Sequence, residues 1–427
     1  MKKVLFITQS YPSVRSANVL CDDMVIQRLL EKSSAEIHCL CMRYDGQPLE
    51  EDVGGVHVHR FRVGPLFEFE DRALGGKDPN MMKLVHFLER VQLRIAQLVT
   101  IPIYPCICPL KTAMYVRESE KAYSKYGFDI VACEHFGFET MMAGLRLKKR
   151  HPELRYIQFF WDALSAGIPA KYLPRAYVDK KRRALEAHVF ATADVSVALN
   201  SHRGELEKQS YAVNALASGR LCYLGIPNLE NVSEKVGNCR CDLFVNGTRN
   251  IVYAGSTSGR DVDFIVRVVR ETGDPNLRLW FFTSTDLSGI DLPVGKSGPR
   301  VIVHPYIPHE ELLKVLVNAD ALLNLGNADS SAIPSKVTQY IGCRRPIIST
   351  FSIDSDTSKE LLSKYPASLF LDERRTDYPV IATELTAFID EASSPIAPYD
   401  DLAELYRSSL PDAYCDLFNL PAKKIDF

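Results

Sequence analysis

The 427-residue sequence has no apolar run near the roughly 18 residues that a membrane span needs, so we expect any membrane contact to be peripheral. It also lacks an excess of charge of one sign, because 51 basic and 53 acidic residues give a net charge of −2. General nucleic-acid binding depends on a strongly positive surface, so we expect no nucleic acid partner. Internal repeats and low-complexity segments are absent as well.

The cysteines lack the spacing of a metal site. Eleven cysteines include three Cys-x-Cys pairs, but there is no Cys-x-x-Cys and no histidine at zinc spacing near them. We interpret the pairs as alternation along strands and predict no metal. The odd number indicates a reduced, cytoplasmic protein. The first apolar run, residues 4–8, is too short for a secretory signal and predicts a buried strand.

Length and composition predict two globular domains. Apolar residues make up 46% of the chain and charged residues 24%, as in ordinary soluble proteins, and 427 residues fit two domains of about 200 residues each. Strand-like and helix-like runs alternate in both halves, which predicts two mostly parallel sheets with helices on both faces. The expected elements of the first half are strands at 4–8, 36–42, 56–62, 129–133, 156–160 and 195–199, and helices at 22–32, 81–99, 141–150 and 171–190.

Turn residues separate the halves. Residues 225–250 are rich in Gly and Asn, include Pro227, and are interpreted as a linker between a first domain, 1–224, and a second, 251–400. A helix at 402–418 is expected within the last segment, 401–427, and it follows a Pro/Ser-rich stretch. We therefore expect this helix to pack on the first domain. The second half is expected to hold strands at 251–255, 279–282, 301–303, 321–325 and 346–349, and helices at 261–272, 308–319 and 334–341.

One segment of the second half has the design of an anion site. An apolar strand ends in a Gly/Asn/Ser loop, and Pro334 then stands where the first residue of a helix is expected, with Ser335 and Lys336 in its first turn. A lysine is unfavourable against the positive end of a helix dipole, so it calls for a compensating anion, for which a diphosphate is suited. A lysine that points into water is the alternative.

Several motifs together resemble the GT-B glycosyltransferases similar to family 4 (group 1). The specific block is Pro-Ser-Lys-Val-Thr-Gln-Tyr at 334–340 followed by Pro-Ile at 346–347. Further similar stretches are residues 128–131, 185–188, 193–195, 251–255, 309–313 and 318–322. The resemblance covers nearly the whole chain. It implies a GT-B fold, an α/β architecture of two doubly wound Rossmann-like domains that face a cleft, with the sugar-nucleotide donor bound by the second domain.

The resemblance also implies roles for residues of the second half. Lys336 and Ser335, with the backbone around Ser330 and Ser331, would hold the donor diphosphate. Gln339 stands where the family usually has a glutamate on the ribose, and an amide can also pair with a hydroxyl. The remaining implied donor contacts are Tyr306 and Ile307 beside the nucleobase, and Gly255, Ser256 and Arg260 in a second phosphate-facing loop.

The family's two acidic positions are occupied here by Ser331 and Gln339, which argues against a retaining mechanism. The Lys-x-x-Gln arrangement is similar to that of an inverting glucuronosyltransferase of bacterial exopolysaccharide synthesis, which takes its base from the first domain. Asp162 follows an apolar strand beside Trp161, and we expect aromatic neighbours to exclude water from it, as suits a base. A simple turn cap is the alternative for Asp162. Glu134 and His135 are further candidates for acceptor contact or proton transfer.

Sequence alone therefore predicts a hexosyltransferase. It would move a sugar from a UDP- or GDP-linked donor to a glycan or lipid-diphosphate-linked acceptor in surface polysaccharide synthesis (capsule, exopolysaccharide or lipopolysaccharide), without a metal or other cofactor. Basic residues at 146–150 and 180–183 favour docking on the inner face of an anionic membrane, or else form a solvated helix face. A sugar-nucleotide 2-epimerase and a catalytically inactive GT-B binding subunit are the alternatives.

Overall fold

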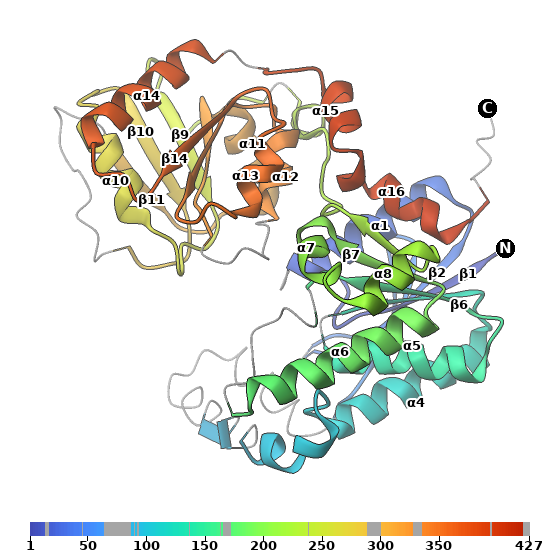
Figure 1. The fold of residues 1–427 in the computed structure, drawn as a ribbon. Coiled ribbons are helices and arrows are strands. Elements are labelled where there is room, and N and C mark those ends of the chain that lie inside the picture. Colours follow the sequence, from blue (N-terminus) through green and yellow to red (C-terminus); the bar gives the residue numbers. More distant parts are fainter. Residues whose placement is uncertain are drawn as a thin grey trace, which may run out of the picture. The chain divides into compact units, whose positions relative to one another are not determined.

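The computed structural model describes residues 1–12, 17–44, 46–63, 87–88, 90–91, 94–135, 137–162, 164, 172–237, 239–287, 300–327, 335–392 and 395–421. These residues form two compact units (Figure 1). The first unit is Met1–Pro227 together with Pro411–Phe427, and the second is Asn228–Leu410. Each unit is built around one sheet.

The sheet of the first unit has eight strands in the order β3-β4-β2-β1-β5-β6-β7-β8. All neighbouring strands are parallel except β3 and β4, which pair antiparallel. The strands are β1 (Lys3–Ile7), β2 (Glu36–Met42), β3 (Glu50–Val53), β4 (Val56–Phe61), β5 (Ile130–Glu134), β6 (Arg155–Phe160), β7 (Val195–Leu199) and β8 (Leu221–Leu224).

Helices cover this sheet. Helix α5 packs beside both α4 and α6, whereas α1 packs against α16 through an ion pair between Arg28 and Asp412 (Figure 1). The α-helices of the unit are α1 (Ala17–Lys32), α4 (Pro109–Tyr126), α5 (Phe138–Arg150), α6 (Arg175–Thr192), α7 (Arg203–Leu206), α8 (Ser210–Ala217) and α16 (Pro411–Cys415). Short 3-10 turns are η1 (Ile101–Ile103), η2 (Asn200–His202) and η4 (Asp416–Phe418).

The sheet of the second unit has six parallel strands in the order β11-β10-β9-β12-β13-β14. These are β9 (Arg249–Ala254), β10 (Leu277–Phe282), β11 (Arg300–His304), β12 (Ala321–Asn324), β13 (Ile347–Phe351) and β14 (Ser368–Asp372). The helices are α9 (Val232–Val236), α10 (Val262–Glu271), α11 (His309–Asn318), α12 (Lys336–Gly342), α13 (Thr357–Leu362), α14 (Tyr378–Glu391), α15 (Tyr399–Leu405) and η3 (Arg407–Ser409).

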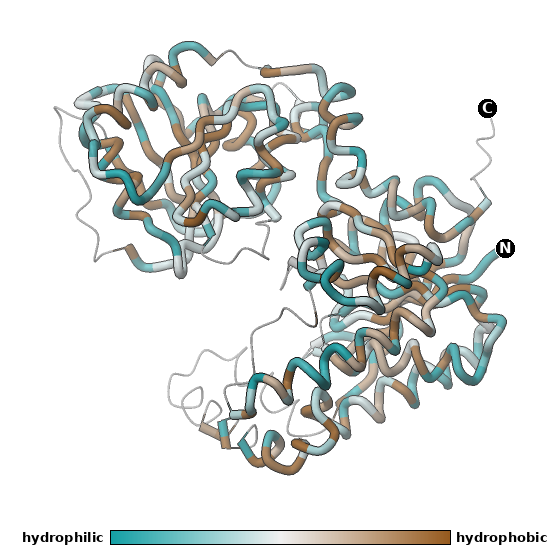
Figure 2. The backbone as a smooth tube through the Cα atoms, viewed as in Figure 1, coloured by the Kyte–Doolittle hydropathy of each residue, from teal (hydrophilic) through white to brown (hydrophobic). Residues whose placement is uncertain are grey.

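Both faces of the second sheet are buried. Alternate residues of β9 enter two separate cores: Ile251 and Tyr253 pack with α10 and α14, and Val252 and Ala254 pack with α11 and α12. A strand buried on both faces needs consecutive apolar residues, which is why the sequence of β9 reads as an uninterrupted run. Figure 2 shows hydrophobic residues along such strands and more hydrophilic stretches on the outer helices.

The predicted alternation of strands and helices in both halves is confirmed, with boundaries shifted by a few residues. Several elements were not predicted. Helix α4 buries only the narrow stripe Tyr115, Ser119 and Ala122, so its apolar pattern is weak. Strand β3, Glu-Glu-Asp-Val, is an edge strand without an apolar core face. Also unpredicted are α7, α8, α9, α13, α14, β8 and β14.

The expected continuous helix at 402–418 is wrong. Helix α15 ends at Leu405 and α16 begins only at Pro411, because proline lacks the N–H group that a continuing helix requires. The chain from Pro411 on belongs to the first unit, and α15 belongs to the second.

Two other expectations need correction. Of the cysteine pairs, Cys39 and Cys41 lie on β2, whereas residues 106 and 108 and residues 239 and 241 lie outside strands. The helix expected at 81–99 is described only in part, and residues 94–99 are helical. In the described part of the chain, no helix combines the length and the apolar character that a membrane crossing requires.

Candidate functional site

The strand order of the second sheet defines a topological switch point. From β9 the chain proceeds to β10 and β11 on one side, and then crosses to β12 on the other. Loops that leave the carboxyl ends of β9 and β12 therefore diverge, and in doubly wound sheets such a crevice is where ligands bind. Gly255 follows β9 and Gly326 closely follows β12, so both glycines lie at this point.

Lys336 reaches the switch point from the first position of α12. Its Nζ lies 3.7 Å from the centroid of the Tyr253 ring and 3.4 Å from the carbonyl oxygen of Ala254, both on β9. The cation therefore lies against the face of an aromatic ring, an attractive arrangement. Ser335 precedes the helix as its N-cap, so Lys336 is the first helical residue, two positions after Pro334, where the helix was expected to begin. Pro334 lies outside the described residues.

Arg260 supplies a second cation. Its guanidinium donates to the carbonyl oxygens of Leu325 and Gly326, the latter at 3.2 Å. Burial, and then the charge of Arg260, lower the pKa of Lys336 well below its usual value. Among the described residues, neither cation forms an ion pair with a carboxylate. A bound anion would therefore offset both the burial of Lys336 and the repulsion between the two cations.

Helix α12 is fixed to the sheet and to the start of the unit. The buried hydroxyl of Tyr340 accepts the N–H of Ala254 at 3.0 Å. Asn228 donates to the carbonyl oxygen of Ser335 at 2.6 Å and accepts from the hydroxyl of Thr338. Sequence reasoning named Tyr340 only as part of the motif and missed Asn228, which is distant in sequence from the helix that it holds.

A buried polar chain supports the loop after β12. The N–H of Gly326 donates to the Thr350 hydroxyl at 2.9 Å, and this hydroxyl donates to Glu373 Oε1 at 2.6 Å. Burial raises the pKa of Glu373. A Cβ at Gly326 would come within 2.8 Å of the Thr350 carbonyl oxygen and of Phe351 Cα, so only glycine fits. Sequence reasoning missed this chain because its members come from three separate segments.

The other donor residues expected from sequence occupy varied positions. Gly255 has φ +130°, where a side chain is strained, and a Cβ there would lie 3.4 Å from Lys336 Nζ. Ser256 is exposed, and Gln339 is half-buried. Tyr306 is 73% exposed after β11, and Ile307 packs partly on the core beneath α11 and α12. Ser330 and Ser331 lie outside the described residues.

The sheet of the first unit has its own switch point, between β1 and β5. Two buried carboxyl groups meet there. Glu134 Oε1 accepts the N–H of Gln9, and Asp22 Oδ1 accepts the indole N–H of Trp161 at 2.9 Å. Burial raises the pKa of both carboxyls, and the charge of Glu134 raises that of Asp22 further. Sequence reasoning missed Asp22, because nothing in an amphipathic helix marks one acid as facing another.

His135 and Asp162 follow the neighbouring strands β5 and β6. Nδ1 of His135 lies 3.1 Å from the backbone oxygen of Asp162, so Nδ1–H is the donor and Nε2 carries the lone pair. Partial burial lowers the pKa of His135. The Asp162 side chain is exposed, so the expected exclusion of water by its aromatic neighbours is wrong. Trp161 turns instead toward Asp22, which takes the buried position.

Comparison with known proteins identifies the architecture. No protein-family model matches the sequence, and neither does any curated protein. The α,α-trehalose 6-phosphate synthase of Burkholderia multivorans superposes with a TM-score of 0.56 at 7% identity, over 98% of this chain and 95% of that chain. This chain has the GT-B fold.

Two further GT-B structures match over a similar share of this chain. A putative UDP-N-acetylglucosamine 2-epimerase of Listeria monocytogenes has a TM-score of 0.51 at 12% identity, over 98% of this chain and 95% of that chain. The glycotransferase of kitacinnamycin has a TM-score of 0.51 at 13% identity, over 98% of this chain and 99% of that chain. Identities this low establish the GT-B fold, and the activity has to be argued from the residues of this chain.

Proposed function

We propose that this protein is a glycosyltransferase that binds a nucleotide-diphosphate sugar at the switch point of its second unit. The observation that carries the proposal is the environment of Lys336. It is a partly buried lysine with a lowered pKa, it has Arg260 as a charged neighbour, and it has no carboxylate partner among the described residues. Burying an unpaired lysine near another cation lowers the stability of the folded protein, and a bound diphosphate would offset this loss of stability.

The donor is proposed to lie with its diphosphate between Lys336 and the loop after β9. Arg260, which now donates to the Gly326 carbonyl oxygen, would add charge to the same oxygens, and Gly255 would allow close approach of the backbone. Gln339, half-buried one turn beyond Lys336, would bond the ribose, with Tyr306 and Ile307 near the base of a UDP- or GDP-linked sugar. Ser335, Ser256, Ser330 and Ser331 complete the proposed donor contacts. Two cations can neutralise the leaving diphosphate, so we propose no catalytic metal.

Transfer to an acceptor requires a base. In the proposed inverting step, the acceptor oxygen forms a bond to the anomeric carbon, the bond to the diphosphate oxygen breaks, and the acceptor proton passes to the base. His135 offers a lone pair at Nε2, and Glu134 and exposed Asp162 are the other candidates. A lowered pKa keeps His135 in the neutral form that can accept a proton at neutral pH.

A sugar-nucleotide 2-epimerase is the second candidate. It needs acidic and histidine side chains for proton transfer, and the first unit places Asp22, Glu134 and His135 around one switch point. A catalytically inactive GT-B subunit is the third. Two features favour this candidate. Asp162 is exposed to water, whereas a catalytic base is usually shielded from it, and Ser331 and Gln339 replace two acids that the chemistry would use.

The experiment that separates these functions follows the donor. The full chain is incubated with a panel of UDP- and GDP-sugars, with and without lipid-diphosphate-linked acceptors, and products are resolved by NMR. Release of the nucleoside diphosphate only with an acceptor supports transfer. Conversion of the donor into its epimer supports the second candidate, and binding without any product supports the third. Absence of binding across the panel contradicts the proposal.

We further propose a surface glycan or lipid-linked acceptor reached from an anionic membrane surface. A groove of about 1100 Å³ along α4 and α5 is lined in part by Arg117, Lys121, Lys125, Arg146 and Arg150. Part of the basic run is used internally, because Lys148 pairs with Asp194 at 2.9 Å and Arg150 with Glu120 at 3.2 Å. Sedimentation with phosphatidylserine vesicles at low salt tests the contact, and absence of binding rejects it.

A further inference from the structure

Three strands at one edge of the first sheet carry an unusual set of polar side chains. Strands β2 and β4 pair in parallel with His38 opposite His57, and β3 pairs antiparallel with β4 so that Asp52 also lies opposite His57. Alternate residues of a strand share a face. Three imidazoles and three carboxylates therefore gather on one face, from Glu36, His38, Glu50, Asp52, His57 and His59.

The set forms a pocket. Its volume is about 480 Å³, and all six of these side chains line it together with Tyr126. It lies toward the amino ends of β2 and β4, whereas Glu134 is the last residue of β5 and His135 follows it. Further along the same face, Leu40, Met42 and Phe61 belong to the apolar core. The cluster is thus a polar interruption of a core-facing surface, away from the carboxyl ends where the candidate residues of this unit lie.

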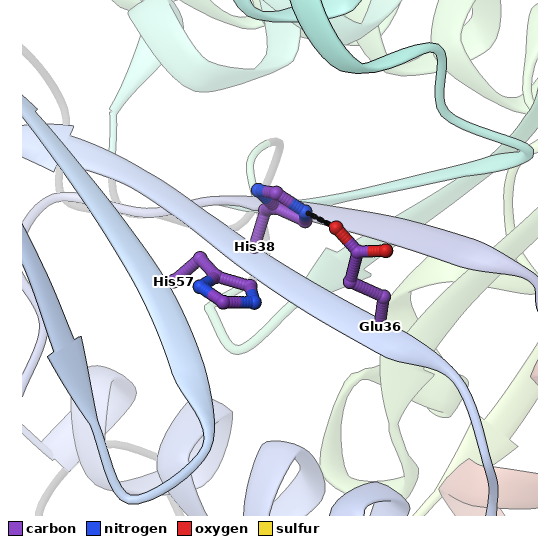
Figure 3. A group of neighbouring side chains, drawn as sticks. All are labelled: Glu36, His38 and His57. Carbon is purple, nitrogen blue, oxygen red and sulfur yellow. Dashed lines mark hydrogen bonds and ion pairs between the residues drawn. The ribbon is translucent and has the colours of Figure 1, made fainter.

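Glu36, His38 and His57 have the geometry of a metal site. Their ligand atoms all lie within 4.8 Å of one another, and His38 Nε2 is 2.7 Å from Glu36 Oε1 (Figure 3). Ligands of tetrahedral zinc lie about 2.0–2.2 Å from the ion, which places them about 3.4 Å apart. The side chain of His57 is 45% exposed, so we expect its ring to move toward the other two side chains when a metal ion binds.

Neighbouring groups fix the proposed ligands. Nδ1 of His57 bonds to Asp52, which leaves Nε2 as the nitrogen for a metal. Nδ1 of His38 lies 2.9 Å from His59 Nε2, which likewise leaves Nε2 of His38 on the Glu36 side. Metal-binding histidines commonly have their second nitrogen bonded in this way. The side chain of His38 is 2% exposed, so its ring is held firmly.

We propose that Glu36, His38 and His57 bind a divalent transition metal, Zn²⁺ by their ligand chemistry, which ties β4 to β2. Two imidazoles and one carboxylate are a zinc-type ligand set, and a water molecule can take the fourth position. Sequence inspection missed it because strand pairing, and not a short motif, brings the ligands together. The role is structural and independent of the proposed sugar transfer.

Zinc titration of the chelator-treated full chain tests this proposal. Isothermal calorimetry with ZnCl₂ is expected to give one equivalent for the unaltered protein, and Glu36→Gln and His57→Gln should each weaken binding at least about tenfold. His188→Gln, an exposed histidine of α6, is the matched control and should bind as the unaltered protein does. Asp52→Asn should weaken binding about 10- to 100-fold, as loss of an outer partner usually does.

Co²⁺ provides a readout that does not depend on heat or on activity. Intense visible absorption of the Co²⁺-loaded protein, lost in His57→Gln, supports coordination by these ligands. Circular dichroism without metal establishes that the variants fold, which is expected because Glu36 and His57 are partly exposed. The proposal is overturned if the unaltered protein binds no metal, or if Glu36→Gln and His57→Gln bind it as tightly as the unaltered protein does.

Discussion

The ammonium group of Lys336 lies over the face of the Tyr253 ring, with Nζ 3.7 Å from the ring centroid. This contact joins the first residue of α12 to the end of β9. The ring stabilises the cation only in part, because burial still lowers the pKa of Lys336. A positive charge on Lys336 therefore costs stability at the switch point, as is common at sites that bind a ligand.

Removal of this charge should stabilise the protein without ligand. Between the lowered folded pKa of Lys336 and the usual lysine pKa of 10.5, the unfolded state binds more protons, so this group makes stability rise with pH in that window. Lys336→Met removes both the cost at neutral pH and this dependence. We expect the melting temperature without ligand to rise, by about 2–4 °C for each kcal/mol gained. Differential scanning fluorimetry measures it, and a lower melting temperature contradicts the prediction.

Tyr340 should be needed for the anchoring of α12. Tyr340→Phe removes the buried hydroxyl that accepts the Ala254 N–H, and an unpaired buried N–H costs about 1–3 kcal/mol. Urea denaturation should show this loss of stability. The matched change Tyr306→Phe affects a ring that is 73% exposed and should stay within about 0.5 kcal/mol. Equal effects of the two substitutions would argue against the anchor.

The buried carboxyl pair should make stability fall as pH rises. Because the folded pKa of Asp22 is raised above 3.8, the folded state keeps a proton that the unfolded state has lost at pH values between the two. Asp22→Asn is uncharged and can still accept from Trp161. The melting temperature of Asp22→Asn minus that of the unaltered protein should therefore increase from about pH 5 to about pH 8. A difference that does not depend on pH would show that Asp22 carries no raised pKa.

Gln339 should act on the nucleoside part of the ligand. Gln339→Ala is expected to weaken UDP binding several-fold and to leave the binding of inorganic diphosphate unchanged, because only UDP carries a ribose hydroxyl for the amide. Lys336→Met should weaken both ligands. Isothermal calorimetry measures the affinity of each variant, Gln339→Ala and Lys336→Met, for UDP and for inorganic diphosphate. Equal weakening of both ligands by Gln339→Ala would place the amide on the phosphates instead.

Much of the fold could be predicted from the sequence, because the apolar pattern within a single strand or helix shows which of its faces are buried. Each central strand, such as β9, is an apolar run because both of its faces are buried, and helices such as α10 have a clear apolar face. Edge strands and thinly buried helices lack these signals, so β3 and α4 were missed. Strand order also escaped prediction, because it depends on pairing between segments far apart in sequence.

The candidate site was predictable to the same extent. Lys336 stood out because a lysine near the start of a helix needs an explanation, and its role in binding stays a prediction. The partners that define its surroundings did not stand out. Asn228 and Glu373 contact the site region from distant segments, and Asp22 faces Glu134 only once the helix and the sheet have packed.

Isothermal calorimetry tests most directly whether Lys336 binds the diphosphate of a nucleotide. UDP and GDP are titrated into the unaltered chain, Lys336→Met and the surface control Lys314→Met. Charged hydrogen bonds contribute about 1.5–3 kcal/mol, so Lys336→Met should weaken the preferred nucleotide about 10- to 150-fold. Lys314→Met, which removes a side chain paired with Glu311 on the surface of α11, should leave affinity unchanged. Nucleotide binding that survives Lys336→Met undiminished, or no binding of either nucleotide, would contradict the account.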